Sequence, residues 1–316
     1  MLRWVARGLV GALAVVGLLS LVLARPSVGH FRTAEGKRVY TAAYAEALAA
    51  MPSPTQTLDI PTDYGTVRAY VWRQPRTADR TPVLLLPGRT SGVPMWSENL
   101  PAIAAERPVI AVDALGDAGL SIQSVPMTTP DDQAVWIDQV VTRLAPDGVH
   151  VLGHSFGGAT AATYARLHPE RVHSLTLLEP VFTVGYPSAR MMGWAMLGSL
   201  PFLPAPLRER ALTEIGGGES ADPDDPIARM ITAGADHYAA QLPNPKVLTD
   251  DQLRGLTMPV YVAIADHDSL AGGQRAAERA AALPDGTVRV WPDTTHSLPM
   301  QVSAELSVEL DRFWGR

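Results

Sequence analysis

The sequence contains no cysteine, and its 316 residues include no run of clustered basic residues. The absence of cysteine excludes disulfide bonds, thiolate chemistry and cysteine-ligated metal sites. The net charge is −6 and the pI is about 5.7, which together with the missing basic runs argues against a nucleic-acid partner. A chain of this length forms a core that needs no disulfide, so export from the cytoplasm stays open.

Charge is also missing between Gly8 and Ala24, where Ser20 is the only polar residue. As a helix this stretch would span roughly 25 Å, close to the thickness of the hydrocarbon core of a bilayer. We therefore expect residues 1–28 to be a membrane anchor or a cleaved signal segment. Two arginines before the stretch favour a cytoplasmic N-terminus. The rest of the chain would then lie outside the cytoplasm, either anchored or secreted.

Beyond residue 57, continuous runs of Val, Leu and Ile alternate with helical stretches. This alternation predicts an α/β fold with a mostly parallel, doubly wound sheet covered by helices on both faces. Between residues 183 and 255 this alternation of strands and helices stops. The segment has many prolines and also apolar residues at helical spacing, which predicts a helical insertion. We therefore divide the chain into a helical arm over 29–56, a core over 57–182 and 256–316, and a cap over 183–255.

One serine, Ser155, stands between a predicted strand and a predicted helix in the stretch HVLGHSFGGATAATYARLHP. Presenting a nucleophile at the end of a strand needs a sharp turn in which bulky neighbours would collide. This explains Gly153 and Gly157, two residues before and after the serine. The N-terminus of the following helix favours negative charge that develops near the serine. Ser155 is therefore the candidate nucleophile.

A serine hydroxyl is a weak nucleophile and needs a base beside it. His296 lies on a loop after the last predicted strand, where such a base is expected in this architecture. His154 is interpreted as a packing residue, because its side chain cannot easily reach back to the adjacent serine.

Three acidic residues could orient the histidine: Asp266 and Asp268 after the strand that follows the insertion, and Glu179 at the end of an earlier strand. The sequence Asp266-His267-Asp268 also raises the possibility of a metal site. Neighbours on a short loop rarely converge on one ion, so we expect no metal here.

Taken in order, these motifs resemble those of the α/β-hydrolase superfamily from about Thr57 to the C-terminus. LLLPG followed by Trp96 is similar to the family's oxyanion strand and loop, and VDALGDAGLS is similar to its D-x-x-G-x-G-x-S loop with one residue added. GHSFGG matches the nucleophile elbow, and ADHD resembles the acid loop. The resemblance implies that Asp268 is the acid, with Asp266 and Glu179 as alternatives, and that the N–H groups of Arg89 and Phe156 form the oxyanion hole.

The sequence departs from the family pattern at two positions. Pro87 replaces the usual histidine before Gly88, and Ala265 replaces the usual glycine of the acid loop. The oxyanion donors are backbone N–H groups, so the first change leaves them available. A serine nucleophile instead of an aspartate argues against the haloalkane dehalogenase and epoxide hydrolase branches.

The resemblance implies a serine hydrolase of the cap-containing esterase and lipase type, which cleaves an ester or related acyl substrate through an acyl-enzyme and needs no cofactor or metal. The same triad can also hydrolyse carbon–carbon or amide bonds or catalyse perhydrolysis, and the fold can serve as a non-catalytic binding protein. Two partners are expected, a small acyl or ester substrate and a membrane bound through the N-terminal helix; the oligomeric state stays open. The predicted acyl pocket, whose residues could equally pack the cap on the core, comprises Trp96, Trp194, Met191 and Met196.

Overall fold

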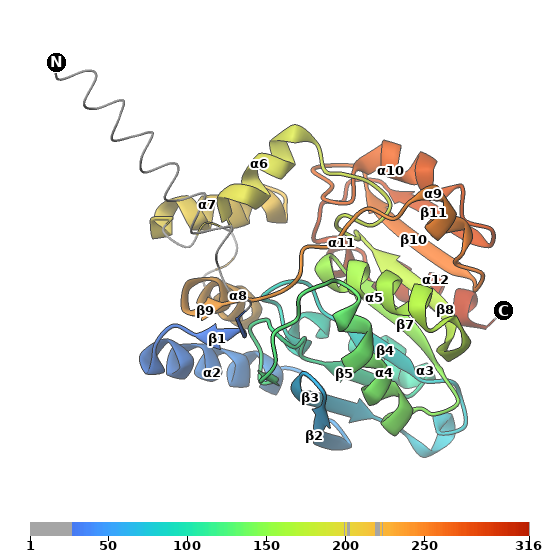
Figure 1. The fold of residues 1–316 in the computed structure, drawn as a ribbon, viewed down its shortest axis with the longest axis horizontal. Coiled ribbons are helices and arrows are strands. Elements are labelled where there is room, and N and C mark those ends of the chain that lie inside the picture. Colours follow the sequence, from blue (N-terminus) through green and yellow to red (C-terminus); the bar gives the residue numbers. More distant parts are fainter. Residues whose placement is uncertain (1–26, 199, 201–202, 219–221, 223, 316) are drawn as a thin grey trace.

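The computed structural model describes residues 27–198, 200, 203–218, 222 and 224–315 (Figure 1). In this part of the chain one large sheet has the strand order β11-β10-β8-β7-β4-β5-β3-β2, and β6 pairs with β3. Neighbouring strands are parallel along the order β11-β10-β8-β7-β4-β5, whereas β3 pairs antiparallel with β5, β2 and β6. The strands are β2 (Gln56–Thr62), β3 (Gly65–Trp72), β4 (Val83–Leu86), β5 (Val109–Val112), β6 (Ile122–Gln123), β7 (Val149–His154), β8 (Val172–Leu178), β10 (Val260–Ala265) and β11 (Gly286–Trp291).

Helices cover both faces of this sheet. Side chains alternate along a strand, so Leu84 and Leu86 of β4 pack into one apolar core and Val83 and Leu85 into the other. The first core is closed by α4 (Asp132–Leu144), α5 (Phe156–Leu167) and α10 (Gly273–Ala280), and the second by α2 (Ala34–Ala49), α3 (Leu100–Glu106) and α12 (Ser303–Trp314). Burial on both faces explains why the strands are continuously apolar, and the predicted α/β sheet is confirmed.

The chain between β8 and β10 is mainly helical. It contains α6 (Ala189–Gly198), α7 (Ala205–Gly216), α8 (Pro226–His237) and α9 (Asp250–Arg254), with the two-residue strand β9 (Tyr238–Ala239) after α8. Helices α6 and α7 pack on each other and project beyond the sheet (Figure 1). Helix α8 ends at His237, because the next two residues form β9, which pairs antiparallel with β1 (His30–Phe31).

Helix α2 of the N-terminal arm packs against α8. The arm and the inserted helices therefore form one continuous layer at the same end of the molecule (Figure 1). No helix in the described ranges is both long enough and apolar enough to cross a bilayer. The uncharged run from Gly8 to Ala24 lies outside the described residues, so the anchor or signal segment stays a prediction.

Candidate active site

Ser155 occupies a strained turn between β7 and α5. Its φ of 54° and ψ of −120° lie in a region that residues with a side chain seldom adopt. A Cβ on Gly153 would lie 2.2 Å from the Gly157 carbonyl oxygen, and a Cβ on Gly157 would lie 2.3 Å from the Leu86 carbonyl oxygen. The two glycines are therefore required by close backbone approach, as the sequence predicts.

His296 reaches this serine from the loop between β11 and α11 (Leu298–Gln301). Its Nε2 lies 2.9 Å from Ser155 Oγ, within hydrogen-bonding distance, and both residues are nearly buried. In this geometry the hydroxyl donates to Nε2, so the imidazole is placed to accept the hydroxyl proton. The structure thus brings together the two residues that the sequence predicts, and their catalytic roles stay predictions.

The carboxylate that contacts His296 belongs to Glu179, the residue after β8. Its Oε2 lies 3.1 Å from His296 Nδ1, and its side chain has no exposed surface. Oε1 accepts hydrogen bonds from the Ala265 N–H and the Ser269 hydroxyl, and Oε2 also accepts from the Leu270 N–H. These donors offset the cost of burying a charged carboxylate and fix its direction. Glu179 was one of the two alternatives in the sequence analysis.

The preference for Asp268 is therefore corrected. The Asp268 carboxylate accepts a hydrogen bond from Arg190 of α6, 2.8 Å away, and it is partly exposed. Its φ is 44°, a left-handed conformation in the turn that follows β10. Asp268, where the family pattern places the acid, therefore links the core to the inserted helices instead of pairing with the histidine.

Asp266, the other alternative, does not contact His296 either. It accepts hydrogen bonds from the His267 ring and from the N–H groups of Asp293 and Thr294. These bonds hold the pKa of Asp266 below its ordinary value against the opposing effect of desolvation. Because Thr294 lies two residues before His296, Asp266 supports the loop that carries the histidine.

The loop expected to provide the oxyanion hole lies beside the nucleophile. A Cβ on Gly88 would lie 3.3 Å from Ser155 Cβ. On one side of Arg89 the Gly88 N–H donates to Met95 Sδ at 3.2 Å, and on the other the Thr90 N–H donates to Asp117 Oδ2 at 2.8 Å. Both neighbours of the Arg89 amide are thus held in place.

The second predicted donor, the Phe156 amide, begins α5 directly after Ser155. A helix N-terminus leaves its first N–H groups without intrahelical acceptors, so they are available to an anion. Together with Arg89, this position suits a pair of donors on either side of a reacting carbonyl oxygen. The oxyanion roles of Arg89 and Phe156 stay predictions.

Sequence reasoning missed Asp117, which lies within the VDALGDAGLS motif. Its side chain is almost fully buried, and burial raises its pKa, whereas the Arg89 charge and the Thr90 and Ala118 N–H groups lower it. Thr90 has a φ of 60°, so the bond from its N–H to Asp117 holds a strained residue. An acidic residue between the two glycines of that motif, Gly116 and Gly119, is the signal that could have identified it.

His154 contacts the candidate base through its backbone. His154 Nε2 lies 3.0 Å from the His296 carbonyl oxygen, so Nε2 carries the proton and donates. Burial, together with the neighbouring His296, lowers the pKa of His154 to about 3. The ring therefore stays neutral and holds the His296 backbone, which is a more specific role than packing.

The inserted helices reach the site at two places. Met191 and Trp194 of α6 pack with Phe156 and Phe182, which flank the elbow. At the end of α7 the Gly216 carbonyl accepts hydrogen bonds from the hydroxyls of Thr295 and Ser297, the two neighbours of His296. The last turn of α7 therefore anchors the histidine loop from both sides.

Two predicted pocket residues lie elsewhere. Trp96 has no exposed surface and packs in the core beneath the short helix η2 (Val93–Trp96), because the loop after β4 folds inward there. Met196 is 64% exposed on α6, since it lies on the side of that helix opposite the buried Met191. Met191 and Trp194 remain candidates for contact with a substrate.

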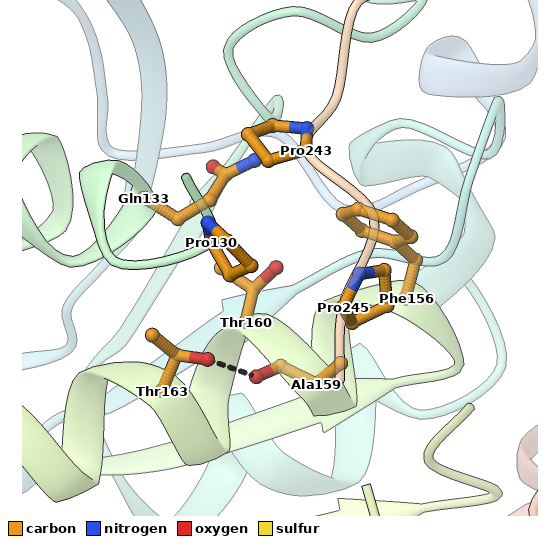
Figure 2. Close-up of a pocket in the computed structure, with 8 residues that line it drawn as sticks. All are labelled: Pro130, Gln133, Phe156, Ala159, Thr160, Thr163, Pro243 and Pro245. Atoms are coloured by element: carbon orange, nitrogen blue, oxygen red, sulfur yellow. Dashed lines mark hydrogen bonds between the residues drawn. The ribbon is translucent and has the colours of Figure 1, made fainter. Parts of the chain in front are cut away.

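A small hollow lies beside α5 (Figure 2). The Phe156 ring points into it next to Pro245, from the segment after β9, and no charged side chain lines it. Thr160 and Thr163 form its floor on α5, and the Thr163 hydroxyl is satisfied by the Ala159 carbonyl at 2.9 Å. The hollow holds the Phe156 ring in place, and Ser155, His296 and Glu179 are not among its lining residues.

Comparison with known proteins agrees with this geometry. Residues 81–208 match the family model described as alpha/beta hydrolase fold. The chain is 28% identical to carboxylesterase YbfK of Bacillus subtilis (strain 168) over 79% of its length and 84% of the relative. The crystal structure of naproxen esterase from Bacillus subtilis superposes with a TM-score of 0.79 at 24% identity, over 90% of this chain and 99% of that one.

A further crystal structure, that of a membrane phospholipase A, superposes with a TM-score of 0.70 at 18% identity, over 99% of this chain and 98% of that one. These superpositions cover nearly the whole chain, so the described fold is shared with solved structures. The chain has the α/β-hydrolase fold.

Proposed function

We propose that this protein is a serine hydrolase that cleaves carboxylic esters through an acyl-enzyme. The observation that carries the proposal is the continuous hydrogen-bonded series Ser155–His296–Glu179, with distances of 2.9 and 3.1 Å. Ester hydrolysis is favoured over the other reactions of this triad because relatives that match most of the chain are named carboxylesterases. A binding protein without catalysis would not need these three side chains joined by hydrogen bonds.

In the first half of the proposed reaction, Ser155 Oγ attacks the ester carbonyl carbon while His296 Nε2 takes the hydroxyl proton. The carbonyl oxygen becomes an oxyanion between the Arg89 and Phe156 N–H groups. Glu179 stabilises the imidazolium. When the carbon–oxygen bond to the alcohol breaks, His296 returns the proton to the leaving alkoxide.

In the second half, a water molecule loses a proton to His296 and attacks the acyl-enzyme carbonyl. Collapse of this intermediate releases the carboxylic acid and returns the proton to Ser155 Oγ. The protein's own residues supply every proton acceptor and donor in this scheme. Met191 and Trp194 with Phe182 make the approach apolar, which favours an acyl group with a hydrocarbon chain.

The test is covalent labelling with a fluorophosphonate probe, together with p-nitrophenyl esters of increasing chain length. We expect the unaltered chain to be labelled and Ser155→Ala to be unlabelled with its melting temperature preserved. Equal labelling of the alanine variant would exclude Ser155 as the nucleophile. A labelled enzyme that cleaves a matched anilide but no ester would move the function to amide hydrolysis.

We also propose that residues 1–28 attach the chain to a membrane, or direct its export, with the hydrolase part outside the cytoplasm. The support is the uncharged sequence from Gly8 to Ala24 and the arginines before it. In cells, we expect the intact chain to fractionate with membranes and to be accessible to external protease. Recovery of the full-length chain in the cytosol would refute this.

A further inference from the structure

Three large apolar side chains are exposed where α6 passes into α7. Met196 is 64% exposed, Leu200 50% and Leu207 46%. We call this region the cap tip; it comprises the described residues between 196 and 207. Single exposed apolar residues are ordinary on a protein surface, but several at one projecting end mark a contact surface.

The cap tip is joined to the start of the described chain by a short series of contacts. Arg208 donates a hydrogen bond to the Leu203 carbonyl at 2.8 Å and also pairs with Asp236 near the end of α8. The His237 carbonyl then accepts from the Arg32 N–H at 2.8 Å, and β9 pairs with β1. The tip and the first strand therefore lie at the same end of the molecule, as Figure 1 shows for α7, α8 and β1.

The sequence just before this strand indicates what covers the tip. The uncharged run from Gly8 to Ala24 ends six residues before His30. Six residues span at most about 20 Å, so a membrane that held this run would lie within about that distance of β1. If that segment inserts in a membrane, the lipid surface must lie close to the end of the molecule that carries the cap tip.

We propose that the cap tip is a lipid-contact surface, with Met196, Leu200 and Leu207 inserted among the headgroups of the bilayer that holds the N-terminus. This inference rests on the membrane attachment proposed above. A segment in the membrane and an apolar surface patch act as two signals, which together hold a protein more firmly than either alone. The contact also fixes the orientation of the hydrolase on the lipid.

The same two helices continue from the tip to the active site. Helix α6 carries Trp194 toward Phe156, and α7 ends at the carbonyl that binds Thr295 and Ser297. A tip in contact with lipid would thus place the apolar side of the cap between the bilayer and Ser155. This arrangement suits an ester with a long acyl chain that is taken from the lipid surface rather than from solution.

The absence of cysteine allows a sharp test. In the full-length chain we would introduce Leu207→Cys, or independently Leu200→Cys, and attach an environment-sensitive fluorophore. Val308→Cys is the matched control, because Val308 is a 52% exposed apolar residue on α12, far from the tip. The probe is a vesicle of phosphatidylcholine and phosphatidylglycerol that carries a shallow nitroxide quencher, and cosedimentation measures binding separately.

We expect the label at position 207 to shift to the blue and lose at least half of its emission on quencher-containing vesicles, while the label at position 308 stays unchanged. Vesicle-bound chain with an unchanged label at positions 207 and 200 would overturn the proposal and leave membrane attachment standing. A blue shift that depends on protein concentration without vesicles would assign the tip to a second copy instead. Chain that does not bind vesicles would overturn both proposals.

An activity assay extends the test to the hydrolase. Leu207→Glu should lower hydrolysis of a long-chain ester embedded in vesicles at least fivefold while leaving a short soluble ester unchanged, and Val308→Glu should change neither. Equal rates of Leu207→Glu and Val308→Glu on the embedded ester would contradict the inference. The fluorescence readout needs no catalysis, so failure of the ester-hydrolase proposal is distinguishable from failure of this one.

Discussion

His154 donates a hydrogen bond from Nε2 to the backbone carbonyl of His296, so the residue before the nucleophile holds the residue that activates it. We predict that His154→Phe, which fills the space without a donor, lowers kcat about tenfold with little change in KM. His154→Gln, whose amide can donate from a similar reach, should recover most of that loss. One hydrogen bond of about 1 kcal/mol corresponds to this range of rates.

Steady-state hydrolysis of one p-nitrophenyl ester by both variants checks this prediction. A purely structural role would lower the melting temperature of the Phe variant and leave its kcat intact. That outcome, or a Gln variant no better than Phe, would count against a positioning role.

The second prediction concerns the acid. Glu179→Gln should lower kcat by about 10² to 10⁴, because an amide no longer stabilises the imidazolium and cannot satisfy every N–H and O–H donor around it. Asp268→Asn should change kcat by less than about threefold, because Asp268 contacts Arg190 and not His296. The three enzymes are compared side by side on one activated ester. A large loss of kcat in Asp268→Asn, together with a nearly unchanged kcat in Glu179→Gln, would contradict the structure.

A third prediction addresses the loop beside the nucleophile. In Asp117→Asn, the side-chain NH₂ group faces the N–H of either Thr90 or Ala118, so one of these two hydrogen bonds is lost. The loop that holds the Arg89 amide is then less well fixed. We expect kcat to fall about ten- to a hundredfold with KM little changed, below the loss that follows complete removal of an oxyanion donor. Asp59→Asn, which removes only an exposed ion pair with Arg68, is the control. Equal kcat values for the two variants would exclude this role for Asp117.

The elbow glycine allows a stability test. Gly157→Ala would push a Cβ to 2.3 Å from the Leu86 carbonyl oxygen, so the backbone of α5 or the end of β4 must move. We expect a loss of several kcal/mol in the free energy of unfolding, and a drop of about 10 °C in melting temperature. Gly193→Ala is the control, since no atom lies within 4 Å of its Cβ position and α6 should gain about 0.5 to 1 kcal/mol. A Gly157→Ala variant as stable as the control would refute the packing argument.

The fifth prediction concerns pH. Burial lowers the pKa of both His150 and His154 to about 3, whereas an unfolded histidine titrates near 6.5. Below pH 6.5 the unfolded state therefore binds protons that the folded state does not, and stability falls as the pH falls toward 3. Burial raises the pKa of Asp113 to about 6, which works in the opposite direction between pH 6 and 4.

Burial also raises the pKa of Asp117, which acts in the same direction as Asp113, but the large downward shifts of the two histidine pKa values outweigh both aspartates. Urea unfolding should therefore show lower stability at pH 5 than at pH 7. Each histidine contributes about 2 kcal/mol of that loss between pH 6.5 and 5. His154→Gln should reduce the difference by about that amount. An identical pH dependence in the His154→Gln variant would disprove the assignment.

The sequence was sufficient for the sheet, the elbow and the histidine because each depends on a local pattern. Continuous apolar runs predict strands that are buried on both faces, and the spacing of Gly153, Ser155 and Gly157 predicts a strained turn. His296 was found by its place after the last strand. These features need no knowledge of which distant side chains meet.

The acid could not be assigned in this way. Glu179 and Asp268 both follow strands that end at the same edge of the sheet, so both carboxylates lie within reach of the histidine loop. What decides between them is the set of donors around Glu179 and the position of Arg190, which come from segments far apart in the sequence. The same holds for Trp96, whose place in the core depends on how the loop after β4 packs under α2.

The Gly216 carbonyl sets a requirement for any inserted segment that is transplanted from a relative. It accepts bonds from both neighbours of His296, so a transplanted cap must offer an acceptor at that point or leave two hydroxyls without partners. Because Glu179 precedes the insertion and His296 follows it, the reacting groups themselves would survive such a graft. Chimeras that differ only in the last turn of α7 would show whether an exchanged cap changes substrate specificity or abolishes activity.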